Sequence, residues 1–341
     1  NELYVEAAKN ALYAAQGRAS ANTHADRARA LFQADTDLMA YFNKRFMNGK
    51  WDHFMDQSHI GYTTWRDPPS NTMDAIHLAR VTVPEAAGLG IAVEGSTDAW
   101  PGATGTPALP AFDALNRQQS YIDVFDRGQT PFTFTATPSA PWIVLSDRGG
   151  TIGDDTRITV TVDWAHAPMG DAAGTITIAG AGTSVAVHVT SRTPADVTRA
   201  TLTGFAEGDG YVSIEPEHYT KKTDAGSRRW IRIEDYGRTL SGMRADGPVD
   251  VAPATPGTDA PSLEYRMYML DPGAVTTHLI LAPTLNFMPG RPLQVAVSFD
   301  DEAPQTVTVV PAGYNAAGRD WEASVENNAR TITTPHRITP A

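Results

Sequence analysis

The spacing of apolar residues changes near residue 80, and this change limits the folds open to the chain. Before it, apolar side chains recur three and four positions apart, which lines one face of a helix. The first stripe comprises Tyr4, Ala7, Ala8, Ala11, Leu12 and Ala15, and the second comprises Leu31, Phe32, Leu38, Met39, Phe42 and Phe46. The second stops at Asn48-Gly49, a pair suited to a helix C-terminus. Residues 1–84 are therefore predicted to be the C-terminal part of a helical bundle domain.

Beyond residue 80 the pattern is that of β-structure. Glycine and proline punctuate residues 84–110, which are predicted to be an irregular lead-in. Apolar and polar residues then alternate strictly in five runs, at 121–125, 132–135, 158–162, 175–178 and 185–189. Such runs, separated by turn residues, are typical of an antiparallel sandwich. Residues 85–194 are therefore predicted to be an immunoglobulin-like β-sandwich, with a linker at 191–194.

A further set of alternating runs fills the last third of the chain. These runs lie at 211–214, 229–233, 263–268, 278–281 and 293–299, with an interruption at 252–261. They predict a jelly-roll-like β-sandwich over residues 195–341. The expected fold class is thus multi-domain, α then all-β. Apolar strands do not alternate with helices as a (β/α)₈ barrel requires, so no such barrel is predicted within these residues.

Charge and composition exclude several partners. The formal net charge is −12, whereas a nucleic-acid backbone or an anionic membrane surface attracts clustered Lys and Arg. The absence of cysteine excludes disulfides and thiolate metal sites. No run of 18 apolar residues crosses a membrane. We expect neither nucleic acid nor a membrane as a partner.

Aromatic, histidine and aspartate side chains gather between residues 51 and 65. His53, Asp56 and His59 stand three positions apart, but two histidines six positions apart on one helix lie roughly 120° apart around its axis. They cannot reach one metal ion unless the helix breaks. Two interpretations stay open: contact with a sugar substrate through His53, His59, Tyr62 and Trp65, or a mostly buried corner between helix and loop.

Carboxylates offer no obvious catalytic pair. Glycoside hydrolysis needs two carboxyl groups that face each other, and neighbours on a strand point to opposite faces. The acidic pairs are therefore predicted to be turn and surface residues, at 154–155, 234–235 and 300–301. No catalytic residue is predicted.

One aromatic residue is a candidate for sugar stacking. Along residues 263–268, Tyr265 shares a face with Met267, which predicts a core position. Tyr268 shares a face with Glu264 and Arg266, so its ring is predicted to lie on a polar face, where a pyranose could stack on it.

Several collinear strings carry a resemblance to a known family. Residues 50–65 read KWDHFMDQSHIGYTTW. They resemble the W-x-H-M-M-D-Q-x-H-I-G-Y-T-x-W stretch of glycoside hydrolase family 115. The strings at 93–96, 100–102, 121–125, 210–215, 217–220, 237–243, 283–287 and 298–301 are similar to the same family in the same order.

The resemblance implies that the chain is the C-terminal accessory portion of a xylan α-1,2-glucuronidase, a hydrolase that removes (4-O-methyl)-glucuronic acid side chains from glucuronoxylan. The implied partners are an upstream catalytic barrel of the same protein, xylan or glucuronoxylan, and a second copy in a homodimer. The implied source is bacterial, and the implied location is secreted or periplasmic. Two alternatives stay open, a free-standing carbohydrate-binding protein and a dimerisation scaffold.

The last domain also resembles jelly-roll carbohydrate-binding modules at its start. Such modules often begin with an acidic pair like Glu215 and Glu217, which binds a structural Ca²⁺ through carboxylate oxygens. No cofactor other than this possible structural calcium is expected.

Overall fold

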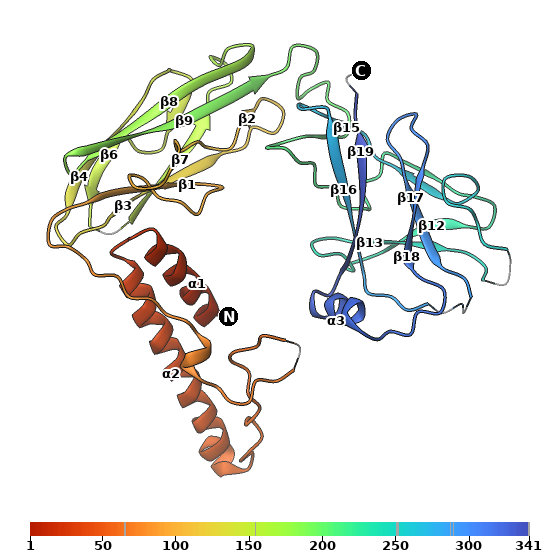
Figure 1. Ribbon diagram of the computed structural model, residues 1–341, viewed down its shortest axis with the longest axis horizontal. Helices are drawn as coiled ribbons and strands as arrows, with labels where there is room; N and C mark the ends of the chain where they lie inside the picture. Colours follow the sequence, from red (N-terminus) through yellow and green to blue (C-terminus); the bar gives the residue numbers. More distant parts are fainter. Residues whose placement is uncertain (65, 154, 250–251, 287, 289, 340–341) are drawn as a thin grey trace. The chain divides into compact units, whose positions relative to one another are not determined.

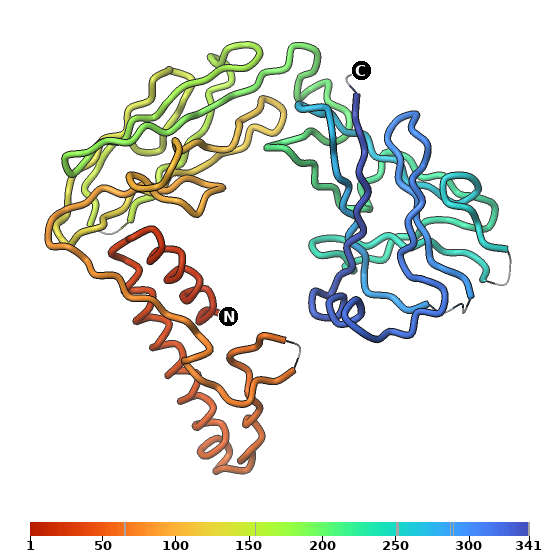
Figure 2. Tube along the Cα trace, in the orientation of Figure 1, coloured from red at the N-terminus to blue at the C-terminus, as the bar shows by residue number. Residues whose placement is uncertain are grey.

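The computed structural model describes residues 1–64, 66–153, 155–249, 252–286, 288 and 290–339, and Figure 2 traces the chain through them. The chain divides into two compact units, Asn1–Arg199 and Ala200–Ala341. The helices and the first β-region thus belong to one compact unit. The domain limits 1–84, 85–194 and 195–341 stay predictions.

Two antiparallel helices open the first unit, α1 (Glu2–Ala15) and α2 (Ala21–Lys44) (Figure 1). Short 3₁₀ turns follow at η1 (Phe46–Gly49) and η2 (Met73–Ala75). The predicted helices are present, but the predicted apolar face of α1 is wrong. Its buried residues are Leu3, Glu6 and Asn10, whereas Tyr4 and Leu12 are exposed. Polar side chains can be buried there because each finds a hydrogen-bond partner.

The buried asparagine clamps an extended stretch of chain against the helices. Asn10 is 0% exposed. Its side-chain nitrogen donates to the carbonyls of Ala21 (2.8 Å) and Ala79 (3.0 Å), and its oxygen accepts from the Ala79 amide at 2.8 Å. Asn22 repeats this with both backbone groups of Val81, at 3.0 and 3.1 Å. We call this arrangement the asparagine clamp (Asn10, Asn22, Ala79 and Val81). It satisfies backbone groups that no strand pairs with.

Nine strands complete the first unit. The four-stranded sheet has the order β1-β3-β7-β5, and the five-stranded sheet has the order β2-β9-β8-β4-β6. Their bounds are β1 Leu89–Val93, β2 Phe112–Asp113, β3 Ser120–Asp126, β4 Phe132–Pro138, β5 Ile143–Leu145, β6 Gly149–Ile152, β7 Asp155–Val162, β8 Gly170–Gly180 and β9 Thr183–Thr193. The pairing is antiparallel except for the short β2–β9 contact. Side chains of both sheets meet in one hydrophobic core, which contains Ile91, Ile122, Phe134, Trp142 and Ile176.

Two predictions in this unit are wrong. The lead-in at 84–110 contains β1, all five residues of which are buried, and its Gly90 lies so close to Phe125 that a β-carbon would come within 2.1 Å of that ring. The low side-chain volume of Gly90 hid the strand from periodicity. The linker predicted at 191–194 overlaps the end of β9, where Ser191 is 0% exposed.

The second unit is built from pairs of strands. They are β10 (Phe205–Ala206) with β15 (Met267–Tyr268), β11 (Lys221–Thr223) with β14 (Ser262–Glu264), β12 (Arg229–Ile233) with β13 (Gly242–Asp246), β16 (Ala274–Leu281) with β19 (Arg330–Arg337), and β17 (Leu293–Val297) with β18 (Gln305–Val310). Helix α3 (Arg319–Glu326) precedes β19. Among the described residues of this unit, only Val310 and Ala329 are buried apolar side chains. The apolar faces of its strands are therefore half-buried.

Two predicted strands of this unit differ from the structure. Residues 211–214 form no strand, and Tyr211 makes only an isolated bridge with Gly208. The run 263–268 is broken into β14 and β15, because each half pairs with a different partner strand. No helix in the described part of the chain is long and apolar enough to cross a membrane.

Candidate functional site

The residues singled out between 50 and 71 form a loop that follows α2, here called the histidine loop. Asn43, which is buried in the last turn of α2, holds its start. The Asn43 side chain donates to Asp56 Oδ1 at 2.7 Å and accepts from the Met55 amide at 2.9 Å. A single side chain thus fixes the direction in which the loop leaves the helix.

His53 lies on the solvent side of the histidine loop. Its side chain is 76% exposed, and its Nδ1 lies 2.6 Å from Asp56 Oδ2. The backbone has φ +65°, a left-handed conformation that costs energy for a residue with a β-carbon. The Asp52 carboxylate supports it by accepting from the His53 amide at 2.9 Å. His53 is therefore accessible and oriented by two carboxylates.

His59 is held from both ring nitrogens. Nε2 lies 3.0 Å from Asp35 Oδ2 on α2, and Nδ1 lies 3.0 Å from the Gln57 carbonyl oxygen. Both partners only accept, so the ring satisfies both when it is the doubly protonated imidazolium. The bond to the Gln57 carbonyl, followed by that to Asp35, raises the pKa of His59 above its usual value. Asn71 Oδ1 accepts from the His59 amide at 2.8 Å.

The two histidines do not share a ligand. His53 bonds to Asp56 and His59 to Asp35, and within the described ranges no three His, Asp or Glu side chains are grouped so as to hold a metal. Tyr62 donates its hydroxyl to Asp67 Oδ1 at 2.8 Å, which raises the pKa of that tyrosine. Trp65 lies outside the described residues. The loop can therefore donate and accept hydrogen bonds, but its groups are not arranged for acid–base chemistry on one bond.

The prediction that residues 51–65 are mostly buried is wrong. Ile60 is buried, but Phe54 is 67% exposed, and Trp51 and Tyr62 are exposed as well. Phe42 stacks on Phe46 at 5.2 Å and on Phe54 at 6.3 Å, while Trp51 meets Phe54 edge-on at 5.6 Å. Leu38, one helical turn before Phe42, is 62% exposed. We call Leu38, Phe42, Phe46, Trp51 and Phe54 the apolar patch.

The expected turn at Gly61 is present. Gly61 has φ +95°, and a β-carbon there would come within 2.6 Å of the Ala75 side chain. The Gly61 amide donates to the Tyr4 hydroxyl at 2.9 Å, so the loop returns to α1 at this point.

Glu215 and Glu217, the candidates for calcium, already have protein partners. Glu217 Oε2 accepts from Arg232 at 3.2 Å, and a hydrogen bond from Ser241 lowers the pKa of Glu217. Glu215 accepts a close hydrogen bond from the Thr239 hydroxyl. Calcium requires six to eight oxygen ligands. As the side chains stand, one oxygen donor faces a guanidinium instead, so this pair does not fit a calcium ion.

Tyr268 is half-buried in β15 beside β10, and its carbonyl accepts from the Glu207 amide at 2.9 Å. Its neighbour Tyr265 is turned inward, donating its hydroxyl to the Pro216 carbonyl at 2.8 Å, and burial raises the pKa of Tyr265 to about 12. Sugar stacking on Tyr268 stays a prediction.

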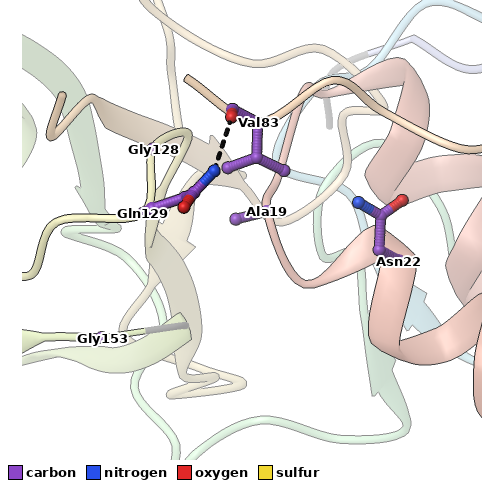
Figure 3. Close-up of a pocket in the computed structure, with 6 residues that line it drawn as sticks. All are labelled: Ala19, Asn22, Val83, Gly128, Gln129 and Gly153. Carbon is purple, nitrogen blue, oxygen red and sulfur yellow. Dashed lines mark hydrogen bonds between the residues drawn. The ribbon is translucent and has the colours of Figure 1, made fainter. Parts of the chain in front are cut away.

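A cavity of about 440 Å³ lies where the helices meet the first sheets (Figure 3). It is lined by Ala19, Asn22, Val83, Gly128, Gln129 and Gly153. Gln129 donates to the Val83 carbonyl at 3.0 Å across one side. None of the described lining residues is ionisable, so the cavity offers no acid or base.

The comparisons with known proteins give one family. Residues 204–341 match the model for the Glycosyl hydrolase family 115 C-terminal domain. The resemblance found in the sequence is thereby confirmed over those residues, and the string at 50–65 lies outside them. A comparison with curated proteins gives no match.

Solved structures with partial likeness are distant. They include a Bacteroides ovatus GH5 xyloglucanase in complex with a XXXG heptasaccharide, at 18% identity, with 30% of this chain and 18% of that chain covered and a TM-score of 0.21. The ASH/PapD-like domain of human CEP192 has 12% identity, 34% and 93% coverage and a TM-score of 0.24. The periplasmic chaperone SfaE has 10% identity, 46% and 98% coverage and a TM-score of 0.24. Such low scores support no argument about function.

Proposed function

We propose that this chain, whose residues 204–341 match the C-terminal domain of glycoside hydrolase family 115, is the accessory portion of a xylan α-1,2-glucuronidase. The parent protein would hydrolyse (4-O-methyl)-glucuronic acid side chains of glucuronoxylan. The match over 204–341 is the observation that carries this proposal. In the same proposal, residues 85–194 are an immunoglobulin-like sandwich, residues 195–341 are a jelly-roll-like sandwich, and the protein is secreted or periplasmic.

The chain would support catalysis rather than perform it. Its sheets are built from antiparallel pairs, apart from β2–β9 and β10–β15, and the histidine loop presents no facing pair of carboxylates of the kind that hydrolysis needs. A catalytic part elsewhere in the same protein is the first expected partner.

The apolar patch is the surface that we assign to this partner. Large exposed apolar side chains next to one another are uncommon on a protein that has no partner. Here Leu38, Phe46, Trp51 and Phe54 are all exposed, on a loop that Asn43 and Asn71 hold in place. A fixed loop that shows apolar side chains outward is suited to docking, because little conformational entropy is lost when it binds.

His53, His59, Tyr62 and Trp65 are proposed to contact the sugar substrate at the rim of that interface. The support is the accessibility of His53 and the hydrogen-bonding groups of His59 and Tyr62 on the same loop. Tyr268 is proposed as a separate stacking position in the second unit.

The proposal is tested on the source protein. Its intact mass should lie well above the 36.6 kDa of this chain, and it should release 4-O-methylglucuronic acid from glucuronoxylan. The 341-residue chain alone should not release it. A source protein of 36.6 kDa, or sustained turnover by the chain alone, would contradict the proposal.

A further inference from the structure

A second cavity, of about 470 Å³, lies in the second unit between β11 and β12. The segment before β11 contributes Glu217 and Tyr219, β11 contributes Lys222, and β13 contributes Met243. Strand β12 supplies the opposite wall, from Arg229 to Arg232. β12 pairs with β13 on one side only, so the cavity runs along its unpaired edge.

The wall of this cavity is positively charged on a negatively charged protein. Lys222, Arg229 and Arg232 face a single carboxylate, Glu217, whereas the whole chain carries a formal net charge of −12. A concave surface with one sign of charge concentrates ligands of the opposite sign. The cavity is therefore suited to an anion.

The three cations differ in how far their donors are already used. Arg232 is committed, with Glu217 at 3.2 Å and Glu234 at 2.7 Å. The Arg229 guanidinium lies 3.9 Å from Asp246, which is beyond hydrogen-bond distance. Lys222 Nζ donates to the Trp230 carbonyl at 3.1 Å and lies 3.6 Å from Asp224, so an ammonium with three protons keeps donors for a ligand. Arg229 and Lys222 are thus the groups that can bind a carboxylate.

Aromatic and apolar side chains complete the wall. Trp230 is held in place because its indole N–H donates to the Pro261 carbonyl at 2.9 Å, and Tyr219 is exposed. Ile231 and Met243 add half-buried apolar surface. A sugar ring has an apolar face that packs on such groups, while its hydroxyls need acceptors such as Glu217. A simple inorganic anion would use only the cations.

We propose that this cavity binds a carboxylate-bearing sugar, with the carboxylate on Arg229 and Lys222 and the ring against Tyr219 and Trp230. The choice of a uronic acid rests on the proposed function, in which the parent acts on a glucuronic acid side chain. The cavity would hold the polysaccharide at a second position, apart from the bond that is hydrolysed. Because the cavity is open and small, we expect a dissociation constant of about 1 mM, or roughly −4 kcal/mol.

The test is a titration of the 341-residue chain with D-glucuronate, D-glucose and acetate, followed by NMR of the tryptophan indole protons. Glucuronate should bind about tenfold more tightly than glucose or acetate, because only glucuronate uses both the cations and the rings. Arg229→Gln and Lys222→Met should each weaken glucuronate binding about fivefold or more. Arg229 is exposed, so its replacement should leave the fold intact.

Lys221 provides a matched control, because it neighbours Lys222 on the same strand and points to the other face, where it pairs with Glu264 at 2.7 Å. Lys221→Met should bind glucuronate as the unaltered chain does. Equal binding of glucuronate and glucose, equal binding of acetate, or an equal loss in Lys221→Met and Lys222→Met would overturn the proposal. These outcomes do not depend on the mass or activity of the source protein, so the two proposals can fail separately.

Discussion

Arg18 and Asp123 are 105 positions apart in the sequence, and their side chains meet at 3.3 Å inside the first unit. The Arg18 guanidinium is 2% exposed and lies between the rings of Tyr13 and Phe125, at 4.0 and 4.2 Å from their centroids. Asp123 also receives two hydrogen bonds from Arg157, at 2.8 and 3.1 Å. The turn between α1 and α2 is thereby attached to β3 through a buried charge.

Replacing Arg18 by Met should destabilise the first unit. A buried ion pair that loses one partner leaves the other charge poorly compensated, which costs about 3 kcal/mol, or a fall in melting temperature of roughly 6–12 °C. Arg29→Met is the control, since Arg29 and Asp26 form an exposed pair and should change stability by less than about 1 kcal/mol. Thermal melting of both variants decides this, and equal shifts would show that the buried pair is not structural.

The histidine loop should be more stable in acid than in base. Because the folded pKa of His59 is raised, its stabilising effect is fully present below the unfolded pKa, about 6.5. It is lost as the pH rises through the higher folded value. NMR titration should place the His59 pKa above about 6.5, and Asp35→Asn should lower it. A His59 pKa unchanged in Asp35→Asn would refute the role of that carboxylate.

Calcium should not stabilise the second unit. Arg232 occupies one face of Glu217, so Ca²⁺ would have to displace a cation before it gained a ligand. Melting temperatures with millimolar Ca²⁺ and with EDTA should therefore coincide. An increase of several degrees with Ca²⁺ but not with Mg²⁺ would mean that the acidic pair rearranges into a site.

The apolar patch should govern association rather than folding. Phe54 and Leu38 are so exposed that Phe54→Ser and Leu38→Ser should change the free energy of unfolding by less than about 0.5 kcal/mol. The same changes should weaken binding to the catalytic part of the source protein. Val144→Ser, at an exposed position on β5, is a control that should not affect binding. Unaltered binding by the Phe54 variant would remove the patch from the interface.

Periodicity predicted the elements whose apolar residues all face one way. Strand β12 occupies the predicted residues 229–233, and β3, β7, β8 and β9 contain the predicted runs. It failed where another interaction decides burial. In α1 the buried face contains Glu6 and Asn10, because His24 lies 2.6 Å from the Glu6 carboxylate and the asparagine clamp satisfies Asn10.

The histidine loop shows the same limit for the candidate site. The sequence located its histidines and the turn at Gly61, but not their partners. Asp35 precedes His59 by 24 residues on a helix, and no local pattern indicates that the two side chains meet. The buried Arg18 was likewise missed, since a lone arginine between two helices usually lies in solvent.

The asparagine clamp makes the amides of Ala79 and Val81 into reporters. Both belong to no helix or strand, yet each donates to a side chain carried by α1 or α2. Their exchange with deuterium is therefore slowed only while the helix that holds the relevant asparagine is docked. Two single-residue rates thus follow the opening of two helices separately, within a stretch of chain that would otherwise exchange as a loop.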